Sequence, residues 1–309
     1  MRIAFLNLCH CEPEIVARAA RKLCAHPDFD MYIHVDEKQD IASFLEAVKG
    51  IPRVYFTGRR YKVYWGGYHA ILATMELLRD AFSSQRHYDY FVTLQNLDYP
   101  IRSNMEIADF FEADPAREYI RGCNIAHTKV WEFARKYRLY YKKDTPLGGK
   151  NQPRLLKLAY NLVMGLLSCT TIFHNGVIRE NGEQYEIHYG CAQWAVTRAC
   201  AEYILKFHET HPKFNRKMAK MQFPDEEYVH TIVHNSPFKE KNFKYNEPMQ
   251  KWLVNWRNLH YFEFPKEVTV LDETYYEKIM SQQGILFCRK VKSGVSDKLL
   301  EMIDRATEK

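Results

Sequence analysis

The sequence predicts an α/β fold in which a mostly parallel sheet is flanked by helices, followed by a C-terminal half of α+β texture. Strand-like apolar segments alternate with amphipathic helical segments through the first 120 residues, which is the pattern of βαβ units. The chain has 309 residues and no long linker-like stretch divides it. We therefore expect one domain spanning 1–309.

The first half supplies the parallel sheet. Its expected strands cover 3–9, 31–35, 54–57 and 90–94. Its expected helices cover 14–24, 41–48, a segment opened by Gly66-Gly67, and 105–111. Sheets of this kind bind ligands where their strands end at the carboxyl edge. Neither GxGxxG nor GxxxxGK[ST] occurs, so we expect neither a dinucleotide fingerprint nor a P-loop.

The second half mixes short strands and helices. The expected strands cover 185–189, 193–196, 259–264, 268–271 and 285–291. The expected helices cover 197–208, 224–234, 272–281 and 295–305. Turn and loop residues fill 142–153.

An apolar helical stripe follows this loop at 155–167, with Lys150, Arg154 and Lys157 nearby. Its uncharged run is too short to cross a bilayer. Two interpretations remain. The helix packs on its own domain or at a subunit contact, or 150–170 lies on a membrane surface as a peripheral anchor.

Composition limits the class of protein. Hydrophobic residues make up 46% and charged residues 27%, as in an ordinary globular domain. The net charge of +6 permits a nucleotide, a lipid phosphate or a membrane surface as partner, but the basic residues are scattered and no nucleic-acid-binding signature occurs. We expect no nucleic acid partner.

Cysteine usage and the N-terminus favour a cytoplasmic protein. The eight cysteines form no CxxC pair and no zinc-finger spacing, which predicts reduced and mostly buried thiols. The chain starts at Met1 and runs directly into its first strand, so we expect neither a signal peptide nor a membrane anchor.

Three carboxylates follow a proline in Pro224-Asp225-Glu226-Glu227. Proline and acidic residues are both common in the first turn of a helix, so helix initiation alone explains the pattern. The functional interpretation is that one carboxylate faces a cleft and removes a proton from a hydroxyl.

Polar residues follow the expected strands. His10 follows the first strand and Asp36 the second, where a ribose or base is bound in open α/β sheets, although Asp36 also suits a simple turn. In Trp65-Gly66-Gly67 the glycines suit either a ligand held at a helix N-terminus or a turn beside a packed tryptophan. Asp28-Phe29-Asp30 matches a DxD metal motif but precedes a strand instead of following one, so we interpret it as a turn.

Six segments occur in the order found in a known family. They are 32–38 (YIHVDEK), 65–68 (WGGY), 94–101 (LQNLDYPI), 189–194 (YGCAQW), 224–226 (PDE) with 231–232 (TI), and 287–290 (FCRK). In this respect the chain resembles the core-2/I-branching β-1,6-N-acetylglucosaminyltransferases, which include the protein O-xylosyltransferases. The match runs from residue 2 to about residue 304.

The resemblance implies a GT-A-type domain that transfers a sugar from a UDP-sugar with inversion and without a metal or other cofactor. It assigns the catalytic base to Glu226 and the donor diphosphate to Lys266 and Lys290. It places the uridine near His10, Asp36 and Trp65. Residues 1–120 would then form the nucleotide-binding half and 121–309 the acceptor-binding and catalytic half.

Departures from the family pattern leave the acceptor open. Phe223 replaces the usual serine before the Pro-Asp-Glu motif, Glu227 adds an acid, and 123–185 does not align. No anchor or disulfide framework is evident, so the chain is similar to a bacterial, cytosolic member. The donor sugar expected is GlcNAc or xylose, and the acceptor a glycan or lipid-linked saccharide.

Two other functions fit parts of the sequence. A glycoside hydrolase also needs two carboxylates beside a sugar, and would release sugar with no dependence on a nucleotide. A non-enzymatic basic module would bind an anionic lipid or nucleic acid with steep salt dependence and no affinity for UDP.

Overall fold

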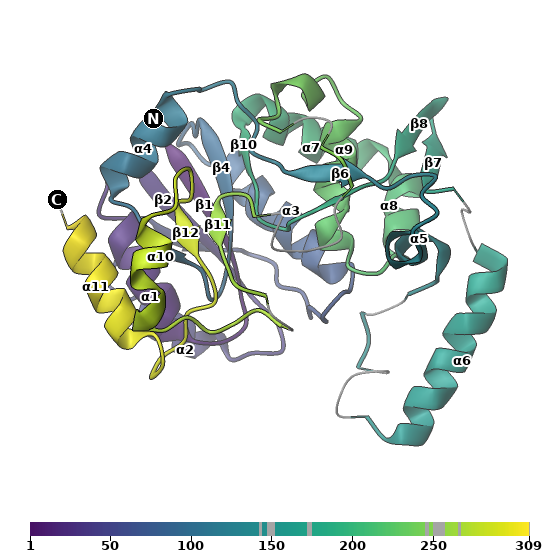
Figure 1. The fold of residues 1–309 in the computed structure, drawn as a ribbon, viewed down its shortest axis with the longest axis horizontal. Coiled ribbons are helices and arrows are strands. Elements are labelled where there is room, and N and C mark those ends of the chain that lie inside the picture. The colour runs from purple at the N-terminus through teal and green to yellow at the C-terminus, as the bar shows by residue number, and fades with distance from the viewer. Residues whose placement is uncertain are drawn as a thin grey trace.

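Parallel strands form the centre of the molecule in the computed structural model (Figure 1), which describes residues 1–141, 144–146, 152–171, 175–244, 247–249, 257–264 and 267–308. The main sheet has the order β10-β4-β1-β2-β3. Its strands are β1 Ile3–Cys9, β2 Phe29–Val35, β3 Val54–Phe56, β4 Tyr90–Gln95 and β10 Ala195–Thr197. β10 is antiparallel to β4 and the other pairs are parallel. This confirms the predicted fold class.

Helices cover both faces of this sheet (Figure 1). The helices of the described residues are α1 Pro13–Leu23, α2 Ile41–Ala47, α3 His69–Phe82, α4 Asn104–Glu112, α5 Trp131–Arg138, α6 Arg154–Thr171, α7 Arg198–Thr210, α8 Pro212–Met218, α9 Tyr228–His234, α10 Tyr276–Met280 and α11 Asp297–Thr307.

Alternating side chains of β1 show why both faces are covered. Ile3 and Phe5 pack into one core, together with α1, α4 and α11. Ala4 and Leu6 pack into a second core, together with α3, α7 and α9. Because successive side chains of a strand point to opposite faces, a strand with apolar side chains on both faces, such as β1, requires a helical layer on each side.

Shorter strands complete the fold. They are β5 Tyr99–Pro100, β6 Gly122–Asn124, β7 Val177–Glu180, β8 Glu183–Glu186, β9 His188–Gly190, β11 His260–Tyr261 and β12 Phe287–Cys288. β12 pairs with both β5 and β11. This small sheet brings the chain near residue 290 back to the segment that follows β4.

Several predicted elements of the second half are wrong in extent. The segment 268–271 is not a strand, and the strands expected at 259–264 and 285–291 contract to β11 and β12. The strand expected at 185–189 is divided between β8 and β9. The helix expected at 224–234 is a 3₁₀ turn, Pro224–Glu226, followed by α9.

Two sequence predictions concern the surface and the cysteines. α6 extends away from the rest of the molecule (Figure 1), and large apolar side chains along it are exposed. Packing of this stripe against its own domain is therefore wrong. Within the described ranges, no helix has both the length and the apolar character needed to cross a membrane.

Seven cysteines in the described part of the chain are free thiols, and all of them except Cys11 are buried.

Candidate functional site

The carboxyl ends of β1, β2 and β4 meet at one edge of the sheet. In register, Cys9 lies opposite Val35, and Leu8 lies opposite Gln95. The chain builds outward from β1 to β2 and β3, then returns to add β4 on the other side. The gap between the ends of β1 and β4 is thus the switch point at which open α/β sheets bind ligands.

Asn96 joins the two strand ends at this switch point. Its Oδ1 accepts hydrogen bonds from the backbone N–H groups of His10 (2.5 Å) and Cys11 (2.6 Å). The side chain is buried, so it fixes the direction in which the chain leaves β1. Sequence analysis did not single out Asn96 as a site residue.

Asp36 is buried just past β2, and its carboxylate is already engaged. Its Oδ1 accepts from the backbone N–H groups of Lys38 (3.0 Å) and Val63 (3.3 Å), and its Oδ2 pairs with Lys38 Nζ at 2.5 Å. Asp36 therefore ties the end of β2 to the segment that leads to Trp65.

His10 lies among these charges. Burial lowers the pKa of His10, and the cations Lys38 and Lys290 act in the same direction while Asp36 opposes them. The structure thus brings three of the predicted site residues, His10, Asp36 and Lys290, into one neighbourhood.

Lys290 follows β12 and is partly buried. Its backbone is fixed by hydrogen bonds to the segment 269–271, with N–H donation to Thr269 O (3.3 Å) and acceptance from Leu271 N–H (2.9 Å). Burial and the adjacent Arg289 lower the pKa of Lys290. Among the residues that the structure describes, no carboxylate pairs with its ammonium group. The second predicted phosphate ligand, Lys266, lies outside the described residues.

Arg289 belongs to a buried ionic cluster instead of facing solvent. Its Nη1 donates to Gln95 Oε1 (2.6 Å), and its Nε lies 3.5 Å from Asp98 Oδ1. His260 Nε2 is 3.2 Å from Asp98 Oδ2. Burial opposes ionisation of Asp98, but Arg289 and His260 outweigh it and hold the pKa of Asp98 below its ordinary value. This cluster sets the position of the neighbouring Lys290.

The three consecutive carboxyl groups at 225–227 occupy different environments. Glu226 sits on the 3₁₀ turn with 25% of its side chain exposed, whereas the side chain of Glu227 is fully buried. Burial raises the pKa of Glu227 to about 8 although Lys136 opposes the shift. Burial and the adjacent Glu226 raise the pKa of Asp225 to about 7.

Lys136 connects this turn to α5, on which it lies, and to Tyr189. Its Nζ lies 3.0 Å from Glu226 Oε2 and 3.3 Å from Glu227 Oε1, and 4.1 Å from the centre of the Tyr189 ring. Burial would lower the pKa of Lys136, but the two glutamates outweigh burial and raise it. Sequence analysis missed Lys136, because no motif marks the helix that carries it.

Trp65 stands at the rim of the same region. Its ring is 80% exposed and meets the ring of Phe223 edge to face, with 4.5 Å between centroids. Gly66 has φ of 74°, and a Cβ there would lie 2.9 Å from the Phe223 ring. The residue that departs from the family pattern, Phe223, therefore packs on the Trp65-Gly66 turn and connects it to Glu226.

Asp144 occupies the N-terminus of α3, where a ligand anion was one of two sequence interpretations. Its carboxylate accepts from the backbone N–H groups of Tyr68 (2.8 Å) and His69 (2.9 Å). A Cβ on Gly67 would collide with Asp144 Oδ1. The paired glycines thus accommodate Phe223 and Asp144, both of which belong to the chain itself.

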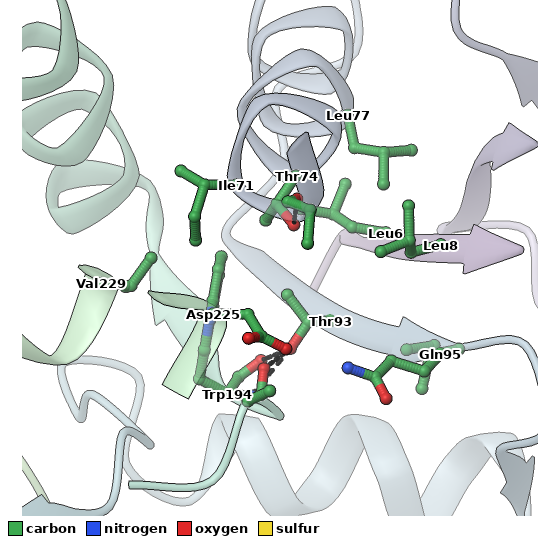
Figure 2. Close-up of a pocket in the computed structure, with 13 residues that line it drawn as sticks. Leu6, Leu8, Ile71, Thr74, Leu77, Thr93, Gln95, Trp194, Asp225 and Val229 are labelled. Atoms are coloured by element: carbon green, nitrogen blue, oxygen red, sulfur yellow. Dashed lines mark hydrogen bonds between the residues drawn. The ribbon is translucent and has the colours of Figure 1, made fainter. Parts of the chain in front are cut away.

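A small pocket lies behind the 3₁₀ turn, between α3 and the ends of β1 and β4. Figure 2 shows the carboxyl group of Asp225 lying beside Thr93 and Gln95, with apolar side chains such as Leu6 and Ile71 around them. The pocket volume of ≈ 30 Å³ suits water and not a sugar. Glu226 and Trp65 are not among the residues that line it.

Both carboxylates of the motif Asp28-Phe29-Asp30 form ion pairs with arginines of the chain. Asp28 lies in the turn before β2 and faces Arg2, while Asp30 lies within β2 and pairs with Arg86. Within the described ranges, no group of three histidine, cysteine, aspartate or glutamate side chains is placed to hold a metal ion.

Comparisons with known proteins point in one direction. A family model described as "Branch: Core-2/I-Branching enzyme" matches residues 3–279. "Xylosyltransferase oxt" of Drosophila melanogaster is 28% identical over 124 residues, covering 40% of this chain and 14% of that protein. "Xylosyltransferase 2" of Homo sapiens is 21% identical and covers 98% of this chain. The chain spans only 33% of the length of that human protein.

Proposed function

The chain belongs to the Core-2/I-branching enzyme family of glycosyltransferases, and on that basis we propose that it transfers a sugar from a UDP-sugar to a hydroxyl group with inversion. The observation that carries the proposal is the separation of the carboxyl groups at 225–227. Only Glu226 is both partly exposed and directly paired with a cation, as a base that must stay ionised beside a substrate requires.

In the proposed reaction, the acceptor oxygen attacks the anomeric carbon from the face opposite the diphosphate. Glu226 takes the acceptor's proton as the new C–O bond forms, and the bond from the sugar to the diphosphate breaks. General-base assistance of this kind is typically worth ~10²–10⁴ in rate. UDP leaves with increased negative charge on its terminal phosphate.

Lys290 and Lys266 are proposed to stabilise that charge in place of a divalent metal. Lys290 is supported by its position beside the strand-end edge and by its ammonium group, which pairs with no described carboxylate. Compact ammonium groups are well suited to phosphate oxygens. Lys266 rests on the family resemblance alone.

The nucleotide is proposed to lie along the strand ends, near His10 and Asp36, with the Trp65 ring at the rim. Because Asp36 already holds backbone amides, its contact with the uridine would use the carboxylate's remaining acceptor capacity. Xylose or GlcNAc is the proposed donor sugar, and the names of the matched relatives favour xylose.

We propose a glycan or lipid-linked saccharide as the acceptor and a cytoplasmic location, with peripheral membrane contact through 150–170. No nucleic acid or further cofactor has a part in this scheme.

The decisive experiment measures nucleotide binding and turnover on the same preparations. Glu226→Gln should retain its affinity for UDP in calorimetry and lose transfer by about 10²-fold or more. Lys290→Ala should weaken UDP binding far more than uridine binding, whereas the exposed neighbour Lys292→Ala serves as the matched control. Turnover should persist in a chelator.

Three results would count against the proposal. Full activity of Glu226→Gln would exclude it as the base, and a strict requirement for Mn²⁺ would refute the two-lysine scheme. Release of sugar from a free oligosaccharide with no effect of UDP would instead favour a glycoside hydrolase.

A further inference from the structure

α6 carries a concentrated apolar surface. Six of its large apolar side chains are between 48% and 81% exposed, namely Leu155, Leu156, Leu158, Leu162, Val163 and Leu166. They are six of the thirteen exposed large hydrophobic side chains in the described part of the chain. Exposed apolar patches of this kind mark sites that meet a protein or a membrane.

The shape of the surface separates these two kinds of partner. At 100° per residue, the six side chains span an arc of about 160° around the helix. A two-helix seam uses a narrower stripe of two positions in seven. The broad arc is typical of a helix that lies flat in the interface of a bilayer.

The charges near α6 indicate which kind of membrane surface it would bind. No acidic residue occurs between Asp144 and Glu180, whereas this interval contains Lys150, Arg154, Lys157 and Arg179. On the helical projection Lys157 lies opposite the centre of the apolar arc. Arg154 lies about 40° beyond the edge of the arc, where a long cationic side chain extends towards lipid headgroups while the leucines are buried. Anionic headgroups add an attraction for each nearby cation.

We propose that α6 docks the enzyme on a bilayer that contains anionic lipid, with the six apolar side chains inserted, Arg154 at the headgroups and Lys157 on the opposite, polar face. Asp144, ten residues before α6, is bound to the N-terminus of α3 beside the Trp65-Gly66 turn. Docking would therefore hold the rim of the candidate site near the membrane. The docking surface depends on α6 alone. Its use in presenting a lipid-linked acceptor rests on the proposed function.

The test is cosedimentation of the full chain with vesicles of phosphatidylcholine, with and without about 30% phosphatidylglycerol. We expect binding to the anionic vesicles, weaker binding to the neutral ones, and a decline as salt rises. The triple variant Leu155→Ser/Leu162→Ser/Leu166→Ser should lose affinity by about tenfold or more. Leu45→Ser/Met105→Ser/Val295→Ser is the matched control, because it removes exposed apolar side chains from elsewhere.

Arg154→Gln/Lys157→Gln should abolish the preference for anionic vesicles and keep a residual affinity for neutral ones. Equal binding by the two triple variants, or no vesicle binding by the natural chain, would overturn the proposal. A concentration-dependent dimer that is lost only in the α6 triple variant, without vesicle binding, would assign the surface to a second copy. UDP affinity measured on the same samples separates failure of docking from failure of the proposed function.

Discussion

Asp225, Glu226 and Glu227 show how strongly the immediate environment separates identical chemical groups. The 3₁₀ turn directs Glu226 outward, while the start of α9 carries Glu227 into the core. In the buried environments of Asp225 and Glu227 the pKa values rise to about 7 and 8. Both pKa values lie near neutral pH, so Asp225 and Glu227 can hold a proton there, whereas Glu226 is the partly exposed member of the trio that pairs with Lys136.

Replacing Lys136 tests whether the ionised state of this trio depends on its cation. Lys136→Met preserves the length of the side chain and removes the charge 3.0 Å from Glu226. We expect turnover to fall by about tenfold or more at pH 7, and the acid limb of the pH–rate profile to move to higher pH because carboxylates lose a stabilising charge.

UDP affinity should be unchanged in Lys136→Met, since the nucleotide is proposed to lie at the strand ends near His10 and Asp36. Lys136→Arg restores the charge and should recover part of the activity. A uniform loss across the pH range in both variants would show that Lys136 acts only through packing.

The elements of the first half follow from the sequence because each one obeys a single pattern. β1, β2 and β4 are mostly apolar and almost entirely buried, and they lie within two residues of their predicted bounds. The segment 268–271 shows the opposite case. It is apolar and β-branched, but its backbone bonds are scattered, from Thr269 N–H to Glu263 O and from Leu271 N–H to Lys290 O. Propensity alone does not distinguish such an extended segment from a strand.

The candidate site likewise contains residues that the sequence predicted and residues that it did not. Family motifs supplied Glu226, Lys290 and Asp36, whereas Lys136 and Asp144 lie in a region without a recognisable motif. Their importance depends on contacts that bridge 90 and 76 residues of chain. No local pattern encodes contacts of that kind.

The N-terminus of α3 provides a test of one such contact. Asp144→Ala removes the carboxylate that caps the first turn, which should destabilise the protein by about 0.5–2 kcal/mol. Because Trp65 and Gly66 precede this turn, we also expect weaker UDP binding. Asp40→Ala, which removes the cap of α2, is the control. It should lower stability in urea denaturation and leave UDP affinity unchanged. If both variants bind UDP like the natural chain, Asp144 serves stability alone.

The whole chain contributes to the candidate site. Its members run from His10 to Lys290, and the small sheet of β5, β11 and β12 brings the C-terminal part to the strand ends of the first half. The prediction of a single domain with a nucleotide half and an acceptor half agrees with this distribution and stays a prediction. Buried titratable groups are also spread over the molecule, which links its stability to pH.

Buried histidines contribute to the acid side of that dependence. Burial lowers the pKa of His34 to about 4 and of His230 to about 3, and it also lowers the pKa values of His188 and His234. Below pH 6.5 these histidines bind protons in the unfolded chain. In the folded state they stay neutral until the pH falls to their lowered pKa values. Each such group removes about 1.4 kcal/mol of stability per pH unit while the difference lasts.

Glu227 acts in the opposite direction on the alkaline side. Its folded pKa of about 8 lies above the ordinary 4.5, so the folded state holds a proton that the unfolded chain has lost. The stability that this proton confers is fully present below pH 4.5 and disappears as pH rises to about 8. We therefore expect urea denaturation to show declining stability both below pH 6.5 and from pH 6.5 to 8. Glu227→Gln cannot ionise, so it should flatten the alkaline decline and steepen the acid decline between about pH 4.5 and 6.5, where the proton on Glu227 offsets the effect of the histidines. Glu226→Gln, at the partly exposed neighbour, should leave both limbs in place. An alkaline decline that persists undiminished in Glu227→Gln would mean that another group produces it.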